Sequence, residues 1–190
     1  MPENETYLDR FTTAVDKSDK WECTGDDDFE PPIPQNVTIK TYLEAVDHFI
    51  DQHPFGINIR TACAPIHFNL WHFLRYNNLP SIITIGDIAW KGKRQFQTSY
   101  SDLKREWRGA HTGSNSKFNA HVWLTLPSGD RVIDLSALPY LMGEAPQDFN
   151  WKNSIFISNY VHSTEPLEHI PYLVGVNFLL KSGVVEVAHY

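Results

Sequence analysis

The stretch that decides the fold runs from Phe118 to Leu135 and reads FNAHVWLTLPSGDRVIDL. Its first half has a period of two, which is typical of a strand whose two faces differ. One face carries Asn119, His121, Trp123 and Thr125, and the other carries Ala120, Val122, Leu124 and Leu126. The tetrad Pro127-Ser128-Gly129-Asp130 is typical of a turn, and Arg131 to Leu135 predicts the returning strand. The stretch therefore predicts an antiparallel hairpin.

The loop of this hairpin sets its register. With Ser128 and Gly129 facing each other at the centre, Trp123 opposes Asp134, and His121 is the diagonal neighbour of Asp134 on the same face. A carboxylate within hydrogen-bond reach would fix the tautomer and orientation of the imidazole. A register shifted by one residue would put the two side chains on opposite faces. The alternative for each residue alone is a half-buried strand histidine and a solvated strand-end acid.

Two helices are predicted before the hairpin. The first is capped by Asn36 or Thr38 and continues to about Gln52, and the second begins near Cys63 with Pro65 in its first turn. The apolar stripe of the first helix consists of Leu43, Val46, Phe49 and Ile50. The stripe of the second consists of Ile66, Leu70, Phe73 and Leu74. Both stripes have the spacing of three and four that indicates a helix.

The remaining pattern predicts strands. Residues 81–90 are rich in β-branched side chains, and further strands are expected at 154–160, 172–180 and 184–189, the last two joined at Ser182-Gly183. Helices come first and an antiparallel sheet follows, so the fold class is α+β.

Cys63 has the position of a reactive thiol. The first turn of a helix presents free backbone N–H groups and the positive end of the helix dipole, which favour a thiolate. The same N–H groups can stabilise a developing oxyanion. The alternative is a buried cysteine that packs as a small hydrophobic residue. The second cysteine is Cys23, and two cysteines are too few for a disulfide framework, so in a reducing compartment both are expected as free thiols.

Composition excludes several classes. The chain has 190 residues, 42% of them hydrophobic, which is enough for one globular core. No run approaches the length of a membrane span, and the polar start MPENETYLDR does not resemble a signal peptide. We therefore expect no membrane partner and a cytoplasmic location by default, with signal-less secretion left open. The net charge of −7 argues against a nucleic-acid partner. The oligomeric state is left open.

The charge is unevenly distributed. Residues 1–36 carry ten acids and three bases, and residues 91–118 carry seven bases and two acids. We expect 1–36 to be an acidic arm with one short helix near 5–16, and 37–190 to be a single domain. The arm is expected to dock on the basic segment and limit access to Cys63.

The basic segment has weak periodicity and predicts a long loop next to the His121 strand. As a lid it would attract an anionic substrate through Arg94, Arg105 and Arg108. The alternative is a solvated loop whose charge pairs with the acidic arm.

These features together resemble a known family. Cys63 at a helix start, a helix and a strand, then His121-Val122-Trp123-Leu124, a turn and Val132-Ile133-Asp134-Leu135 are similar to the transglutaminase-like branch of the papain-like cysteine enzymes. The order is also similar to that of the arylamine N-acetyltransferases, with Arg60 ahead of the cysteine. The resemblance covers about residues 40–136. It departs at Ala62, where the family has glycine.

The resemblance implies a papain-like core and a thiolate that attacks an amide, ester or thioester to form an acyl-enzyme. His121 would be the general base and acid, and Asp134 its orienter. Gln52 and Asn58 are candidates for the oxyanion site beside the Cys63 N–H, and Trp123 would shelter the cleft or pack. The implied substrate is a peptide, a protein or a small acyl-bearing molecule, with no cofactor.

Two other functions remain open, a cysteine peptidase of the same fold and a binding module without turnover. A metal site is not expected. The chain has nine histidines, but His67 and His72 do not share a helix face, and neither His-x-x-x-His nor Cys-x-x-Cys occurs.

Overall fold

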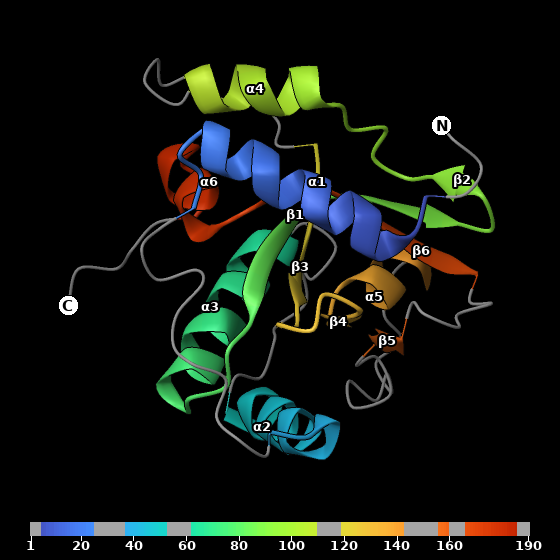
Figure 1. Ribbon diagram of the computed structural model, residues 1–190. Helices are drawn as coiled ribbons and strands as arrows, with labels where there is room; N and C mark the ends of the chain where they lie inside the picture. Colours follow the sequence, from blue (N-terminus) through green and yellow to red (C-terminus); the bar gives the residue numbers. More distant parts are fainter. Residues whose placement is uncertain are drawn as a thin grey trace.

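The computed structural model describes residues 5–24, 37–52, 62–109, 119–142, 156–159 and 166–185. Within them the chain is an α+β protein, as predicted, with a six-stranded sheet and helices on both of its faces (Figure 1). The helices are α1 (Tyr7–Lys20), α2 (Ile39–Gln52), α3 (Cys63–Tyr76), α4 (Tyr100–Gly109), α5 (Ala137–Met142) and α6 (Val176–Lys181). The strands are β1 (Ile82–Trp90), β2 (Lys93–Arg94), β3 (His121–Thr125), β4 (Arg131–Asp134), β5 (Phe156–Asn159) and β6 (Leu167–Val174).

The sheet is antiparallel throughout, with β1 at its centre. β1 pairs with β3 along one edge and with β6 along the other. The short strand β2 pairs with the last two residues of β1, Ala89 and Trp90. β4 follows β3, and β5 lies outside β4. In the β3–β4 hairpin Leu124 pairs with Ile133 and Thr125 with Val132, which confirms the predicted register.

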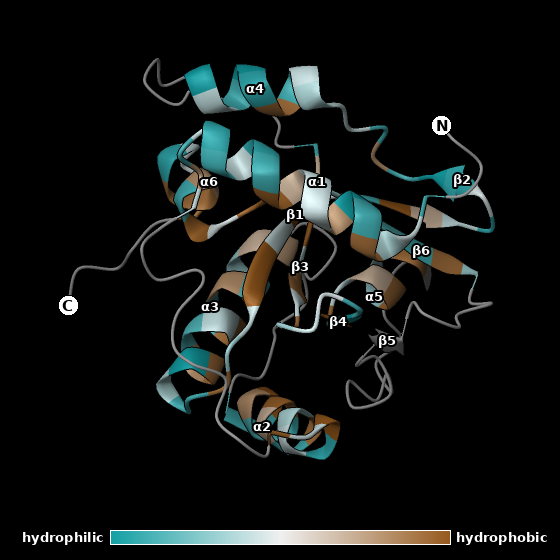
Figure 2. Cartoon of the chain, viewed as in Figure 1, coloured by the Kyte–Doolittle hydropathy of each residue, from teal (hydrophilic) through white to brown (hydrophobic). Residues whose placement is uncertain are grey.

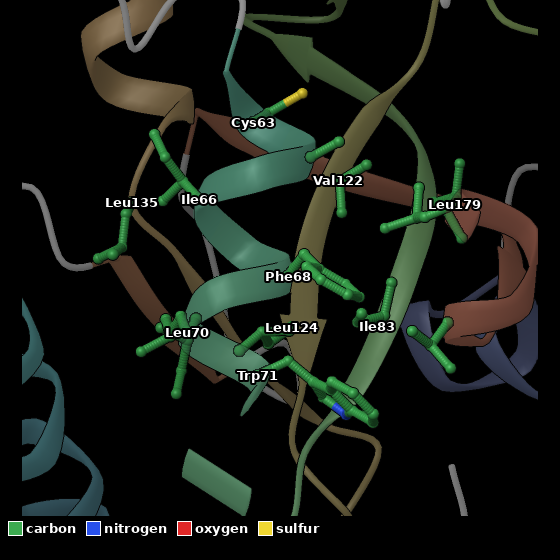
Figure 3. Packing of buried hydrophobic residues seen from close by; sticks show 14 of the residues in the cluster. Cys63, Ile66, Phe68, Leu70, Trp71, Ile83, Val122, Leu124, Leu135 and Leu179 are labelled. Atoms are coloured by element: carbon green, nitrogen blue, oxygen red, sulfur yellow. The ribbon is translucent and has the colours of Figure 1, made fainter. Parts of the chain in front are cut away.

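The two faces of the sheet carry different packing. Val122 and Leu124 of β3 face α3 and belong to the main core with Ile66 and Leu70 (Figure 3). The alternate residue Trp123 belongs to a second cluster, formed with the first turns of α1. Because side chains alternate along a strand, His121 and Trp123 project on the α1 side.

The helix α1 is anchored to that side by its buried residues. Its N-terminus has a capping box between Thr6 and Asp9. The Tyr7 hydroxyl hydrogen-bonds Thr125 at 2.6 Å, and the Ser18 hydroxyl accepts the Val174 N–H at 2.7 Å. The helix expected near 5–16 is therefore present and continues to Lys20. The boundary of the acidic arm stays a prediction, since residues 25–36 lie outside the described part.

The basic segment is not a simple loop. After the β2 turn it forms the helix α4, most of whose residues are coloured as hydrophilic in Figure 2. Leu103 is buried and Tyr100 and Trp107 pack against the main core, at the helical spacing of three and four. The prediction of a loop was wrong because that short apolar stripe is interrupted by charged residues. Residues 110–118 lie outside the described residues.

The C-terminal strands were only partly predicted. β5 falls within the expected strand at 154–160, but the strand expected at 172–180 is wrong. β6 begins and ends earlier, Gly175 turns the chain at φ 109, and α6 follows. A Cβ at Gly175 would lie 2.4 Å from the Cys23 carbonyl oxygen, so only glycine permits this turn.

The Ser182-Gly183 pair ends α6 instead of joining two strands. Gly183 has φ 70, and the Val184 N–H bonds back to the Leu179 carbonyl, the usual glycine termination of a helix. Most of the strand expected at 184–189 lies outside the described residues.

The stripe of α2 was predicted with one error. Val46, Phe49 and Ile50 are buried, but Leu43 is exposed and Tyr42 takes its place, donating a 2.5 Å hydrogen bond to the Pro80 carbonyl. Phe73 of α3 is partly buried against the core.

Among the described residues, no helix combines the length and the apolar character that crossing a membrane requires.

Candidate active site

Cys63 is the first residue of α3, at the margin of the main core (Figure 3). Its side chain is buried, 8% exposed, and its thiol lies 3.9 Å from the Ala120 carbonyl oxygen next to β3. Ala62 precedes the helix and provides no side-chain cap. The N–H groups of the first turn therefore depend on the backbone, water or a ligand for acceptors.

His121 lies between Cys63 and Asp134. Its Nε2 is 2.7 Å from Asp134 Oδ2, and the Cys63 side chain, whose thiol lies beside the Ala120 carbonyl oxygen, is near enough to the ring to raise its pKa. Since Asp134 occupies Nε2, the nitrogen left for the thiol is Nδ1. The three residues singled out from the sequence are thus brought together from α3, β3 and β4.

The charge state of His121 follows from these contacts. Burial lowers the pKa of His121, but the charge of Asp134, the hydrogen bond that the ring donates to Asp134 and the nearby Cys63 side chain outweigh it and raise the pKa to about 10. His121 is therefore an imidazolium at neutral pH. It has the Asp134 carboxylate on one side and the Cys63 sulfur on the other.

Asp134 is held by five donors. Oδ2 accepts from His121 Nε2 and from His169 Nε2, each at 2.7 Å. Oδ1 accepts the Ser136 N–H, the Ser136 hydroxyl and the Ala137 N–H at 2.9, 3.2 and 2.9 Å. Burial alone would raise the pKa of Asp134, but the His121 charge and the hydrogen bonds hold it well below its usual range.

His169 was missed by the sequence reasoning. It lies on β6 opposite Ile88 of β1, so only the pairing of two distant strands brings it to Asp134. Burial lowers the pKa of His169 in spite of its bond to Asp134, so it is a neutral ring that donates through Nε2–H. The apolar residues around His169 could have indicated this strand in the sequence. Pro171 hid the signal, because proline is rare in the interior of a strand.

His67 links the first turn of α3 to the end of β4. Its Nε2 accepts the Leu135 N–H at 3.0 Å, so Nδ1 carries the proton and donates to the Cys63 carbonyl at 2.7 Å. Burial lowers the pKa of His67 to about 4, against the attraction of Asp134. Although its Nε2 is 3.6 Å from Asp134 Oδ1, both atoms are acceptors, so the contact is not an ion pair.

Aromatic rings enclose the imidazole. Phe96 stacks on His121 with ring centres 5.5 Å apart, and Tyr140 stacks on Phe96 at 4.9 Å. Trp123 lies against both His121 and His169, with centroid distances of 6.0 and 5.0 Å. These contacts exclude water from the His121–Asp134 bond.

A second buried carboxylate positions Phe96. Asp87 Oδ1 accepts the N–H groups of Ile88 and Phe96, and Oδ2 accepts the Thr98 N–H and Arg94 Nε. The turn after β1 is therefore organised around one fully buried side chain.

The other residues expected at the site lie elsewhere or have other partners. Trp123 is fully buried and donates to the Tyr7 hydroxyl, so it packs in the interior rather than lining an open cleft. Gln52 ends α2 and hydrogen-bonds His48 at 2.9 Å. Asn58 lies outside the described residues.

The three arginines have different surroundings. Arg94 is paired with Asp87 at 2.7 Å, so much of its charge is neutralised inside the fold. Arg105 is exposed and pairs with Asp102 within α4, and Arg108 is exposed in the last turn of the same helix. Neither residue of α4 is brought to Cys63 by a contact in the described part of the chain.

The His–Asp–His cluster also has the composition of a metal site. Ligand atoms of His121, Asp134 and His169 all lie within 4.8 Å of one another. A carboxylate accepts but cannot donate, so both 2.7 Å contacts need a proton on Nε2. A metal ion would have to displace both protons. Hydrogen bonding therefore accounts for this geometry without an ion.

No family model, curated protein or solved structure matches the chain. The fold and site define an α+β protein with a buried Cys–His–Asp–His cluster, and the function has to be argued from that chemistry.

Proposed function

We propose that the protein is a cysteine-dependent acyl-transfer enzyme with a transglutaminase-like, papain-like core. Cys63 is the nucleophile, His121 the general base and acid, and Asp134 the residue that orients His121. The observation that carries the proposal is the arrangement of the three side chains: the Cys63 thiol lies 3.9 Å from the carbonyl oxygen of Ala120, the residue before His121, and His121 Nε2 lies 2.7 Å from Asp134 Oδ2. Three separate elements converge to make it, and a core cysteine that only packs has no need of an imidazolium–carboxylate pair.

The chemistry follows from the charges. The Cys63 sulfur attacks the carbonyl carbon of an amide, ester or thioester, and the proton of its thiol is held by His121. The oxyanion that forms is stabilised by the backbone N–H groups of Cys63 and Ala64 at the start of α3. The carbon–nitrogen, carbon–oxygen or carbon–sulfur bond then breaks, His121 gives its proton to the leaving group, and a thioester remains on Cys63.

The thioester is resolved by water or by an amine. His121 removes a proton from that second nucleophile, and Cys63 leaves as thiolate. Asp134 keeps the ring in one orientation and stabilises its positive charge in both halves of the reaction. We propose a peptide, a protein or a small acyl-bearing molecule as substrate.

The test is covalent trapping of the acyl-enzyme. The protein is incubated with p-nitrophenyl acetate, and the acetyl group is located by peptide mass spectrometry. We expect one acetyl group on Cys63, sensitive to hydroxylamine and absent from the Cys63→Ala variant. Cys23, which is fully buried, serves as the internal control. Acetylation of Cys23 and Cys63 to the same small extent would contradict the proposal.

A second assay separates the kinds of acyl transfer. Ammonia released from glutamine-bearing peptides, with an intact peptide backbone, would support the amidase or transferase. Cleavage of the backbone without ammonia would identify a cysteine peptidase. A Cys63→Ala variant that keeps the full biological effect would identify a binding module.

A further inference from the structure

A pocket of about 310 Å³ lies on the α1 side of the molecule, between α1, β6 and the first turn of α4. Its walls come from three distant parts of the chain. The polar and aromatic side chains that line it are Arg10, Thr13, Lys17, Arg94, Tyr100 and Tyr172. Glu5 is the one carboxylate among the lining residues.

One face of α1 provides the polar wall. Arg10, Thr13 and Lys17 are spaced by three and four residues, so their side chains lie on the same side of the helix. The Arg10 guanidinium is fixed by Nη1, which donates to Glu168 at 2.5 Å. Its Nε is buried and has no hydrogen-bond acceptor within the described residues. A buried N–H without an acceptor is costly, so the site is favourable for an oxygen atom supplied from outside.

Lys17 adds a cation that is partly withdrawn from water. Its Nζ lies 3.1 Å from the centre of the Tyr100 ring. An aromatic face attracts an ammonium group but does not satisfy its three donors. Burial lowers the pKa of Lys17. A ligand anion next to Nζ would accept hydrogen bonds from the ammonium group and offset the free energy lost by burying its charge.

The remaining charges indicate where the anion goes. Arg94 is already neutralised by Asp87, and Arg10 Nη1 by Glu168. The Glu5 carboxylate lies 3.5 Å from Arg10 Nε, near enough for attraction but beyond a hydrogen bond. A carboxylate therefore fits in front of Nε, and Glu5 occupies that place imperfectly.

We propose that this pocket binds the oxyanion group, carboxylate or phosphate, of a small ligand, with Arg10 Nε and Lys17 Nζ as donors and Glu5 displaced. Tyr100 and Tyr172, whose rings meet edge to face at 4.8 Å, form the wall for the rest of the ligand. The site is independent of the proposed chemistry at Cys63.

Calorimetric titration with inorganic phosphate and with benzoate tests this site. Lys17→Gln and Arg10→Gln should each weaken binding about tenfold, because each removes a charged hydrogen-bond donor. Glu5→Gln should tighten binding several-fold, because it removes the competing carboxylate. Tighter binding of benzoate than of phosphate would identify a carboxylate on an aromatic body, and the reverse would identify a phosphate.

The matched control is Lys40→Gln, which removes the same charge from an exposed position on α2. Its affinity should equal that of the unmodified protein. Thermal unfolding of each variant without ligand checks that α1 remains docked. The proposal is overturned by the absence of binding for both probes in the unmodified protein and in Glu5→Gln. The proposal is equally overturned if Lys17→Gln lowers the binding affinity no more than Lys40→Gln does.

Discussion

Asp134 accepts hydrogen bonds from two imidazole rings and from the turn that follows β4. Its two oxygens have separate tasks. Oδ1 fixes the carboxylate to the start of α5, and Oδ2 meets the two rings. The orientation of His121 therefore depends on a carboxylate that has little freedom to rotate.

An amide cannot replace this carboxylate. In Asp134→Asn the side chain has only one oxygen that can accept hydrogen bonds, so either the two imidazole rings or the turn after β4 lose their acceptor. The His121 imidazolium also loses its counter-charge. We expect the free energy of unfolding to fall by about 3–5 kcal/mol, as when one partner of a buried pair is removed. Urea unfolding measures this loss. The control Ser136→Ala removes only the 3.2 Å hydroxyl contact and should cost about 1 kcal/mol. Equal losses in the two variants would contradict the assignment.

His169 draws part of the charge of Asp134 away from His121. In His169→Leu that donor is lost, so the negative charge acts on His121 alone and the pKa of His121 should rise further. The conservative variant His169→Gln keeps an N–H donor, so the pKa of His121 in this variant should be closer to its value in the unmodified protein. The titration of the His121 ring, followed by NMR, measures both. An unchanged midpoint in His169→Leu would give His169 a packing role only.

At the scale of elements, the central strand β1 needs a glycine where it meets β6. A Cβ at Gly86 would lie 2.1 Å from the Ile170 carbonyl oxygen and 2.8 Å from the Trp123 ring. The register of β1 against β6 shifts at this point, between Ile85 and Gly86. Trp123 in turn packs against His121 and His169, so the close approach of the two strands is part of the site.

Gly86→Ala should therefore destabilise the protein by about 3 kcal/mol, because backbone must move to admit the methyl group. The comparison variant is Gly92→Ala, where a Cβ meets nothing within 4 Å and only the positive φ of 76 opposes it. That strain is worth about 1 kcal/mol. Chemical denaturation of both variants measures the difference. A smaller decrease in the free energy of unfolding for Gly86→Ala than for Gly92→Ala would contradict the close packing of β1 against β6.

The elements that could be predicted from the sequence are those with local signals. The β3–β4 hairpin has strict alternation and a Ser-Gly turn, so its register and the pairing of His121 with Asp134 followed directly. The helix α3 has a clear stripe and begins at Cys63 as expected. His169 could not be found in this way, because its place beside Asp134 depends on the pairing of β1 with β6, about eighty residues apart in the chain.

At the scale of the whole molecule, the buried histidines make stability depend on pH in two directions. His121 has a pKa raised to about 10, so its contribution is complete below the unfolded value of 6.5 and is lost as the pH rises toward 10. His67 has a pKa lowered to about 4, so its contribution is present above 6.5 and is lost as the pH falls toward 4. His169 and His67 act in the same direction.

The free energy of unfolding should therefore be greatest near pH 6.5, with each single histidine contributing a slope of about 1.4 kcal/mol per pH unit on its side. His121→Gln should flatten the alkaline side alone, and His67→Gln should reduce the slope on the acid side alone. Urea midpoints across the pH range measure both slopes. Stability that rises from pH 6.5 to 9 would contradict the charge states assigned to the site.

The central claim is that His121 activates Cys63, and the rate of Cys63 alkylation by iodoacetamide as a function of pH tests it most directly. Iodoacetamide alkylates the thiolate form of a cysteine, and a neighbouring imidazolium stabilises that form. The rate at about pH 6 should therefore be within a few-fold of the rate at about pH 8, and His121→Gln should lower the pH 6 rate about tenfold or more. A Cys63 rate that rises about tenfold per pH unit and is the same in His121→Gln would contradict the account. A Cys63 that reacts no faster than the buried Cys23 at any pH would contradict it as well.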